Sequence, residues 1–180
     1  MRSRLLGRTG LTVSELALGT WGLSGDGYGP IPEGEADRVI DRALERGVTL
    51  FDTADVYGRG EMEAKLAARL PEGTTVLVTK IGTDRDAEPP RKCFDPTFLR
   101  IAFERCQERQ KRDQLDVVLL HNPSMSTLDA SQATNFMTEL KKRGLVRAWG
   151  IAAGRADVAR EAIHQGADVV EIAYNVLAQG

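Results

Sequence analysis

The sequence predicts an α/β protein, a parallel (β/α) barrel of the TIM type that is incomplete and begins with a β-hairpin. Three observations lead to this prediction. Short runs of β-branched and other apolar residues alternate with amphipathic stretches, a pattern that favours parallel strands covered by helices. Successive runs are spaced by roughly 20 to 40 residues, as in barrel units, and about six of the eight units are recognisable. The first run is not followed by the GxGxxG sequence of a doubly wound dinucleotide-binding sheet.

Each expected element follows from local periodicity. The predicted strands cover residues 15–19, 48–52, 75–80, 116–121, 148–152 and 169–173. Apolar residues at helical spacing predict helices between them, around Ile40, Leu66, Phe103, Met137 and Ala162. Residues 3–6 and 11–14 flank a turn with two glycines, which is typical of a β-hairpin. Residues 83–96 predict a long loop. No linker interrupts the pattern, so residues 1–180 are expected to form a single, partial barrel domain.

Composition excludes several classes of function. The 180 residues are 42% hydrophobic, and 24 basic against 26 acidic residues give a net charge of −2. This balance gives no electrostatic reason to expect binding to nucleic acid or to an anionic membrane. No apolar run approaches the roughly 18 residues of a membrane span, and the N-terminus lacks the apolar core of a signal peptide, so a cytoplasmic location is expected. Cys93 and Cys106 predict neither a disulfide framework nor a metal site.

Polar residues follow or end several predicted strands, where a purely structural strand has little need of them. Asp52, Lys80 and His121 each close a strand, and Tyr57 lies five residues beyond Asp52. The carboxyl ends of parallel strands meet at one rim, so these side chains are expected to converge. There the Tyr57 phenol would act as a general acid, with the nearby Lys80 cation lowering its pKa toward working pH. Asp52 would keep Lys80 charged, and His121 would donate a second hydrogen bond to a substrate carbonyl oxygen.

Along nearly all of its length the sequence resembles the aldo-keto reductase family. The motifs that carry this resemblance are Leu18-Gly19-Thr20-Trp21-Gly22, Phe51-Asp52-Thr53-Ala54-Asp55-Val56-Tyr57-Gly58, Thr79-Lys80, Leu119-Leu120-His121-Asn122-Pro123 and Gly144-Leu145-Val146-Arg147-Ala148-Trp149-Gly150. The ordered combination of Asp-Thr-Ala-x-x-Tyr-Gly, Lys and Leu-Leu-His-Asn-Pro is far more specific than any single motif.

The resemblance implies an oxidoreductase that reduces an aldehyde or ketone with NADPH by reversible hydride transfer. It implies that the catalytic tetrad is Asp52, Tyr57, Lys80 and His121, with Tyr57 as the general acid. It also implies a small-molecule carbonyl substrate and an N-terminal hairpin that plugs the bottom of the barrel. The residues expected to bind the cofactor are Gly19, Thr20, Trp21, Asn122 and Glu171.

The sequence also departs from the family pattern. Ala152 and Ala153 stand where a Ser-Asn pair usually holds the nicotinamide carboxamide, and Glu171 replaces a Gln that can donate as well as accept hydrogen bonds. The seventh and eighth units, whose loops bind the rest of the cofactor in the family, are not recognisable. Two other functions therefore stay open: a relative without redox activity that binds or supports a partner, and a cofactor-independent acid/base enzyme. An open barrel edge would also favour association with a second copy.

Overall fold

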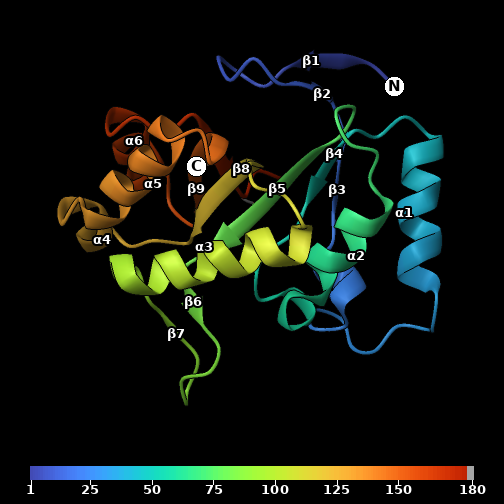
Figure 1. Ribbon diagram of the computed structural model, residues 1–180, viewed down its shortest axis with the longest axis horizontal. Helices are drawn as coiled ribbons and strands as arrows, with labels where there is room; N and C mark the ends of the chain where they lie inside the picture. The colour runs from blue at the N-terminus through green and yellow to red at the C-terminus, as the bar shows by residue number, and fades with distance from the viewer. Residues whose placement is uncertain (178–180) are drawn as a thin grey trace.

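A computed structural model describes residues 1–177 and shows a curled, six-stranded parallel sheet with helices packed on its outer side (Figure 1). The strand order is β10-β9-β8-β5-β4-β3, so each strand lies beside the next strand of the barrel sequence. This arrangement confirms the predicted incomplete barrel of the TIM type. The strands are β3 (Ala17–Gly19), β4 (Leu50–Asp52), β5 (Val76–Ile81), β8 (Leu115–His121), β9 (Val146–Ala153) and β10 (Val169–Ile172).

The helices occupy the five predicted stretches, with one short addition. They are α1 (Glu35–Glu45), α2 (Glu61–Arg69), α3 (Pro96–Gln110), α4 (Met125–Asp129), α5 (Gln132–Lys142) and α6 (Ala156–His164), and the short 3-10 turns are η1 (Trp21–Ser24) and η2 (Tyr57–Gly60). The start of α3 is fixed locally. The Asp95 carboxylate accepts hydrogen bonds from the backbone N–H groups of Thr97 and Phe98, and Pro96 occupies the first turn.

Two antiparallel hairpins lie outside the main sheet. The predicted N-terminal hairpin is formed by β1 (Ser3–Leu5) and β2 (Thr12–Ser14). The second consists of β6 (Thr83–Asp84) and β7 (Arg91–Lys92), where the sequence predicted only a loop. Its strands are two residues long and carry mostly polar side chains, so they leave no hydrophobic alternation that would reveal them. In Figure 1 this hairpin projects from the lower edge of the fold, beyond α3.

Side chains alternate between the two faces of the sheet, as strand geometry requires. The outward face packs against α3, α5 and α6 in a large apolar cluster that includes Trp149, Ile81 and Leu120. The inward face forms a smaller cluster, in which Leu11 and Val13 from the hairpin pack with apolar strand residues. The hairpin therefore covers part of the interior, as the resemblance implied.

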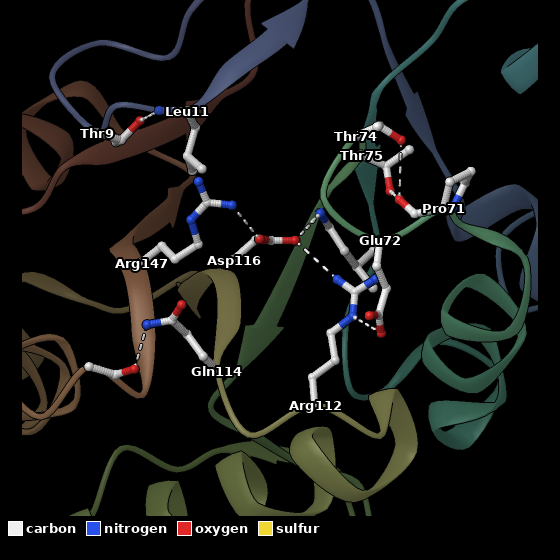
Figure 2. Close-up of polar contacts among 12 residues, drawn as sticks. Thr9, Leu11, Pro71, Glu72, Thr74, Thr75, Arg112, Gln114, Asp116 and Arg147 are labelled. Carbon is white, nitrogen blue, oxygen red and sulfur yellow. Dashed lines mark hydrogen bonds and ion pairs between the residues drawn. The ribbon is translucent and has the colours of Figure 1, made fainter.

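A buried polar cluster lies near the amino ends of the strands, around Asp116 (Figure 2). The Asp116 carboxylate lies 3.2 Å from Arg112 and 3.1 Å from Arg147, and it accepts a hydrogen bond from the Leu77 backbone N–H. This cluster ties β8 to β5 and β9 at the end of the sheet opposite His121. Among residues 1–177, no helix combines the length and apolar character needed to cross a membrane.

Candidate active site

The alternation of the strands directs three of the predicted catalytic residues into the barrel interior. Leu50, Val78 and Leu119 belong to the inward-facing cluster. Asp52, Lys80 and His121 each follow one of these residues by two positions, and a step of two positions along a strand returns to the same face of the sheet. All three side chains therefore point inward near the carboxyl ends of their strands.

Asp52 and Lys80 form an ion pair at the centre of the site. The Lys80 ammonium donates hydrogen bonds to both Asp52 carboxylate oxygens at 2.6 Å and to the Thr53 carbonyl oxygen at 3.0 Å. Only 2% of the Lys80 side chain is exposed. Burial by itself lowers the pKa of Lys80, but the neighbouring carboxylates outweigh it and raise the pKa above its usual value. Lys80 is therefore held as a cation, as the sequence predicted.

Glu171 is the second carboxylate beside Lys80. Its Oε2 atom lies 3.3 Å from the Lys80 ammonium, although about half of the Glu171 side chain is exposed. Burial, opposed by Lys80 and supported by Glu171, raises the pKa of Asp52 above its usual range. The sequence predicted Glu171 as a cofactor contact, but its observed partner is Lys80. An electrostatic link across the sheet from β10 to β5 has no signature in local sequence.

Tyr57 reaches the site from the loop after β4, at the start of η2. Its backbone N–H donates to the Ala54 carbonyl, and the next N–H, that of Gly58, donates to the Asp26 carboxylate at 2.7 Å. Gly58 has a φ of 56°, in the left-handed region that glycine occupies without strain. The Lys80 ammonium lies 5.4 Å from the centre of the Tyr57 ring, and the Tyr57 and His121 rings meet edge to face with centroids 6.2 Å apart.

The protonation of Tyr57 differs from the sequence-based expectation. Burial raises the pKa of Tyr57, and the lowering by Lys80 is further opposed by Asp52 and Glu171, so that the net shift is upward. The expected net shift toward working pH was wrong because the lysine charge is shared with two carboxylates and the phenol is half-buried. Tyr57 therefore carries its proton at neutral pH and can donate a hydrogen bond.

His121 is neutral under the same conditions. Burial is the main cause that lowers the pKa of His121 to about 3, and the cations of Lys92 and Lys80 lower it further. The buried Nδ1 atom has no hydrogen-bond partner among residues 1–177. A neutral imidazole has one N–H donor and one acceptor nitrogen, so His121 retains a donor without a positive charge.

A cavity of about 410 Å³ opens in front of Tyr57 and His121. Its walls also include Trp21, Pro90 and Arg85. Arg85 was not among the predicted site residues. It donates to the Val56 carbonyl oxygen at 2.5 Å and so fixes the segment before Tyr57. Arg85 comes from the β6–β7 hairpin, whose path the sequence did not predict. The cavity has the size of a small-molecule site.

The residues predicted to bind a cofactor lie near the same rim, but they are not equally available. The Thr20 hydroxyl already donates to the Asp52 carbonyl oxygen at 2.8 Å, and Trp21 packs against Tyr28 with ring centroids 5.4 Å apart. Asn122 is exposed directly after His121, with a φ of 55°. Gly19 ends β3. Among residues 1–177, no cluster of three metal-binding side chains is present.

Asn122 and Glu171 are the two predicted residues whose polar side chains can fit a nicotinamide carboxamide. On the sheet, Ala152 pairs with His121 on one side and with Glu171 on the other. An amide side chain can both donate and accept, whereas a carboxylate accepts from the carboxamide NH₂. The methyl groups of Ala152 and Ala153 offer neither interaction. The donor set is therefore compatible with the nicotinamide end of a cofactor.

Fold and site together define a β/α-barrel protein with its polar site at the carboxyl ends of the strands. The sequence profile of the Aldo/keto reductase family matches residues 15–179, so this chain belongs to that family. It is 30% identical to the "Uncharacterized oxidoreductase YqkF" of Bacillus subtilis across 89% of this chain and 52% of that protein. It is also 30% identical to the "NADH-specific methylglyoxal reductase" of Escherichia coli, across 98% of this chain and 60% of that protein.

Solved structures agree with this assignment. The holo form of aldo-keto reductase AKR11C1 from Bacillus halodurans aligns with a TM-score of 0.84 and 27% identity, over 97% of this chain and 58% of that one. The chain thus spans between half and two thirds of the length of these relatives. The chain is a member of a family of oxidoreductases, and its fold is an incomplete barrel.

Proposed function

We propose that this chain provides the carbonyl-reducing site of an aldo-keto reductase, with Tyr57 as the general acid. The observation that supports this most directly is that Tyr57 and His121 line one cavity while the Lys80 ammonium lies 5.4 Å from the centre of the Tyr57 ring. A protonated phenol and a neutral imidazole can both donate hydrogen bonds to one carbonyl oxygen. Two such donors stabilise the negative charge that develops on that oxygen during reduction.

The proton transfer assigns a separate role to each residue. Tyr57 donates its proton to the substrate oxygen and becomes a phenolate. The Lys80 cation stabilises that phenolate, while Asp52 holds the ammonium in place through two hydrogen bonds of 2.6 Å. His121 orients the carbonyl group and remains neutral. Because Glu171 shares the Lys80 charge, the phenolate is less stabilised than it would be beside Lys80 and Asp52 alone.

We infer that the cofactor is NADPH, which supplies the hydride when bound. Asn122 and Glu171 would hold its carboxamide, and Gly19, Thr20 and Trp21 would lie along the nicotinamide end. The E. coli relative is named for NADH, so the affinities of this chain for NADPH and NADH need to be compared. The altered amide contacts at Ala152, Ala153 and Glu171 predict weak binding. Cofactor fluorescence during titration of this chain with NADPH and with NADH measures it directly.

The test of Tyr57 compares two tyrosines of the same region. Tyr57→Phe should lower the turnover of a small aldehyde by at least about 10², because positioned acid catalysis typically supplies 10²–10⁴. Tyr28→Phe is the matched control, since Tyr28 is exposed and does not line the cavity. Methylglyoxal is a suitable first substrate because the E. coli relative is named for it. Unchanged turnover in Tyr57→Phe would rule out Tyr57 as the acid.

The remaining expectations from the sequence stay proposals. A cytoplasmic location and association through the β10 edge are consistent with the fold, and light scattering of the purified chain tests the association. A non-redox binding protein and a cofactor-independent acid/base enzyme gain no support from the comparisons.

A further inference from the structure

A second hollow lies beside the active-site cavity, between η2, the β6–β7 hairpin and α3. Its volume is about 110 Å³. Four arginines line it: Arg59 from η2, Arg85 from the hairpin, and Arg105 and Arg109 from α3. Two of these guanidinium groups join elements together, since Arg85 donates to the Val56 carbonyl oxygen and Arg109 on α3 pairs with Glu63 on α2. None of the residues assigned to catalysis or to cofactor binding lines this hollow.

Within residues 1–177, two of these arginines form no ion pair. Arg109 is held by the fully buried Glu63 at 2.6 Å, and Arg85 lies 3.5 Å from Asp26. Arg59 and Arg105 form no ion pair with any other residue of the described chain. Arg59 also has a φ of 56°, a left-handed conformation that arginine rarely adopts. Strained backbone of this kind is concentrated at binding sites.

Three aspartates also line the hollow, and they oppose part of its positive charge. Asp84 is occupied, because its carboxylate accepts hydrogen bonds from the backbone N–H groups of Asp86 and Ala87. Asp86 contributes a carboxylate at the hairpin. One carboxylate oxygen of Asp55 is buried without a hydrogen-bond partner among residues 1–177. The hollow therefore contains two arginines without an ion pair and one carboxylate oxygen without a hydrogen bond among residues 1–177. Its lining has four arginines and three aspartates.

Asp55 repels an anion only when its carboxyl group is ionised. Burial, followed by the charge of Glu63 on α2, raises the pKa of Asp55 to about 7, although Arg109 on α3 and Lys92 on β7 oppose the shift. At neutral pH a substantial fraction of Asp55 is therefore protonated. A protonated carboxyl group donates a hydrogen bond, in contrast to a carboxylate, which only accepts.

We propose that this hollow binds a phosphate-type oxyanion, with Arg59 and Arg105 as the principal ligands and the buried carboxyl group of Asp55 as a further contact. The guanidinium group presents planar pairs of N–H donors that match phosphate oxygens, and it does so better than a lysine ammonium. Arg85 completes the wall on the side of the hairpin.

The position of the hollow suggests what the oxyanion does. Val56, Thr83 and Arg85 line both this hollow and the active-site cavity, so the two sites share a wall. The oxyanion is therefore either the phosphate group of a carbonyl substrate whose reactive end lies at Tyr57, or a free anion bound beside the Tyr57 segment. Both have the same binding chemistry, and the experiments below separate them.

The first experiment measures binding of inorganic phosphate to the complete chain by calorimetry, at constant ionic strength and without cofactor. We expect saturable binding that Arg59→Gln and Arg105→Gln each weaken by at least about tenfold, the loss typical of one charge-assisted hydrogen bond. Arg100→Gln is the matched control, because Arg100 lies on α3 but does not line the hollow. Absence of saturable binding, or equal weakening by Arg100→Gln, would overturn the proposal.

The second experiment examines Asp55 with sulfate, whose charge does not change near neutral pH. Sulfate should bind more tightly at about pH 6 than at about pH 8, because Asp55 gains a negative charge across this interval. Asp55→Asn should remove most of this pH dependence and leave the affinity near that of the low-pH protein. A pH dependence that persists unchanged in Asp55→Asn would contradict the role of Asp55 as a donor.

The third experiment separates the two sources, and it alone rests on the proposed carbonyl reduction. It compares a neutral aldehyde with its phosphate ester in the wild-type chain and in Arg105→Gln. If the oxyanion is part of the substrate, the variant raises KM at least about tenfold for the ester only. If a free anion binds, both aldehydes respond alike. Failure of turnover would count against the reductase proposal, and the calorimetry would still decide the anion site.

Discussion

The Glu171 carboxylate lies 3.3 Å from the Lys80 ammonium, on the side where β10 borders the site. Lys80 also contacts Asp52, so one buried cation is shared by two carboxylates. In the family pattern from which this sequence departs, a neutral Gln stands in place of Glu171. The substitution therefore changes the charge of the site as well as its hydrogen bonds, and its effect extends to the phenol of Tyr57.

Glu171→Gln should lower the pKa values of Tyr57, Lys80 and Asp52 together. In each case Glu171 is a cause that raises the pKa, so removing its charge shifts the value downward. A more acidic Tyr57 loses its proton at lower pH. NMR of labelled tyrosine rings measures the shift for Tyr57, and any aldehyde turnover should lose its basic limb at lower pH.

Glu104→Gln provides the control for this change, since it removes one negative charge from the exposed face of α3. Glu104→Gln should leave the pKa of Tyr57 unchanged. An unchanged Tyr57 pKa in Glu171→Gln would show that solvent screens the carboxylate from the site, since about half of the side chain is exposed.

Removing the Lys80 charge should destabilise the fold. Lys80→Met leaves Asp52 without its cation in a buried setting, and breaking a buried pair in this way costs about 3 kcal/mol or more. The double variant Lys80→Met with Asp52→Asn removes both charges, so it should recover part of the lost stability. Urea denaturation of the wild type, both single variants and the double variant measures the coupling. A double variant less stable than Lys80→Met would be incompatible with an uncompensated Asp52 charge.

His121 should remain neutral throughout the range in which histidine usually titrates. In the unfolded chain this histidine binds a proton near about pH 6.5. In the native chain its pKa is about 3, so the proton binds only at much lower pH. The contribution of neutral His121 to the free energy of unfolding is therefore fully present above about pH 6.5 and is lost as the pH falls toward about 3. The chain contains two histidines, so ring NMR signals of His121 can be compared with those of the exposed His164 in one spectrum. Protonation of His121 near pH 6.5 would contradict this prediction.

Much of this site could be predicted because strand geometry is regular. Asp52, Lys80 and His121 end three strands, and strands of one parallel sheet bring such residues to one rim. Their inward direction could also be inferred, since each follows an apolar inward residue by two positions. Tyr57 could be placed at the same rim because it lies five residues beyond Asp52, in the loop after the strand, and the family resemblance then implied its role as the acid.

The electrostatic balance of the site could not be predicted in the same way. The pKa of Tyr57 depends on burial and on the distances to Lys80, Asp52 and Glu171, none of which is a local property of the sequence. The β6–β7 hairpin escaped prediction because two-residue strands have no periodicity. With the hairpin unplaced, the position of Arg85 between two cavities was also beyond sequence reasoning.

The cluster around Asp116 supplies the last prediction, which concerns stability away from the site. Asp116 accepts from the Leu77 backbone N–H and lies within 3.2 Å of Arg112 and 3.1 Å of Arg147. Asp116→Asn keeps the shape of the side chain but removes the charge that both arginines share, as the contacts in Figure 2 make clear.

We expect Asp116→Asn to lower the free energy of unfolding by about 1.5 to 3 kcal/mol, the range for a hydrogen bond to a charged group. The exposed Asp113, three residues earlier, gives the matched control Asp113→Asn, which should change stability by less than about 0.5 kcal/mol. Urea denaturation compares the two. Equal stabilities would show that the Asp116 charge contributes no more than a surface charge, because the cost of burying it would then offset its contacts with the two arginines.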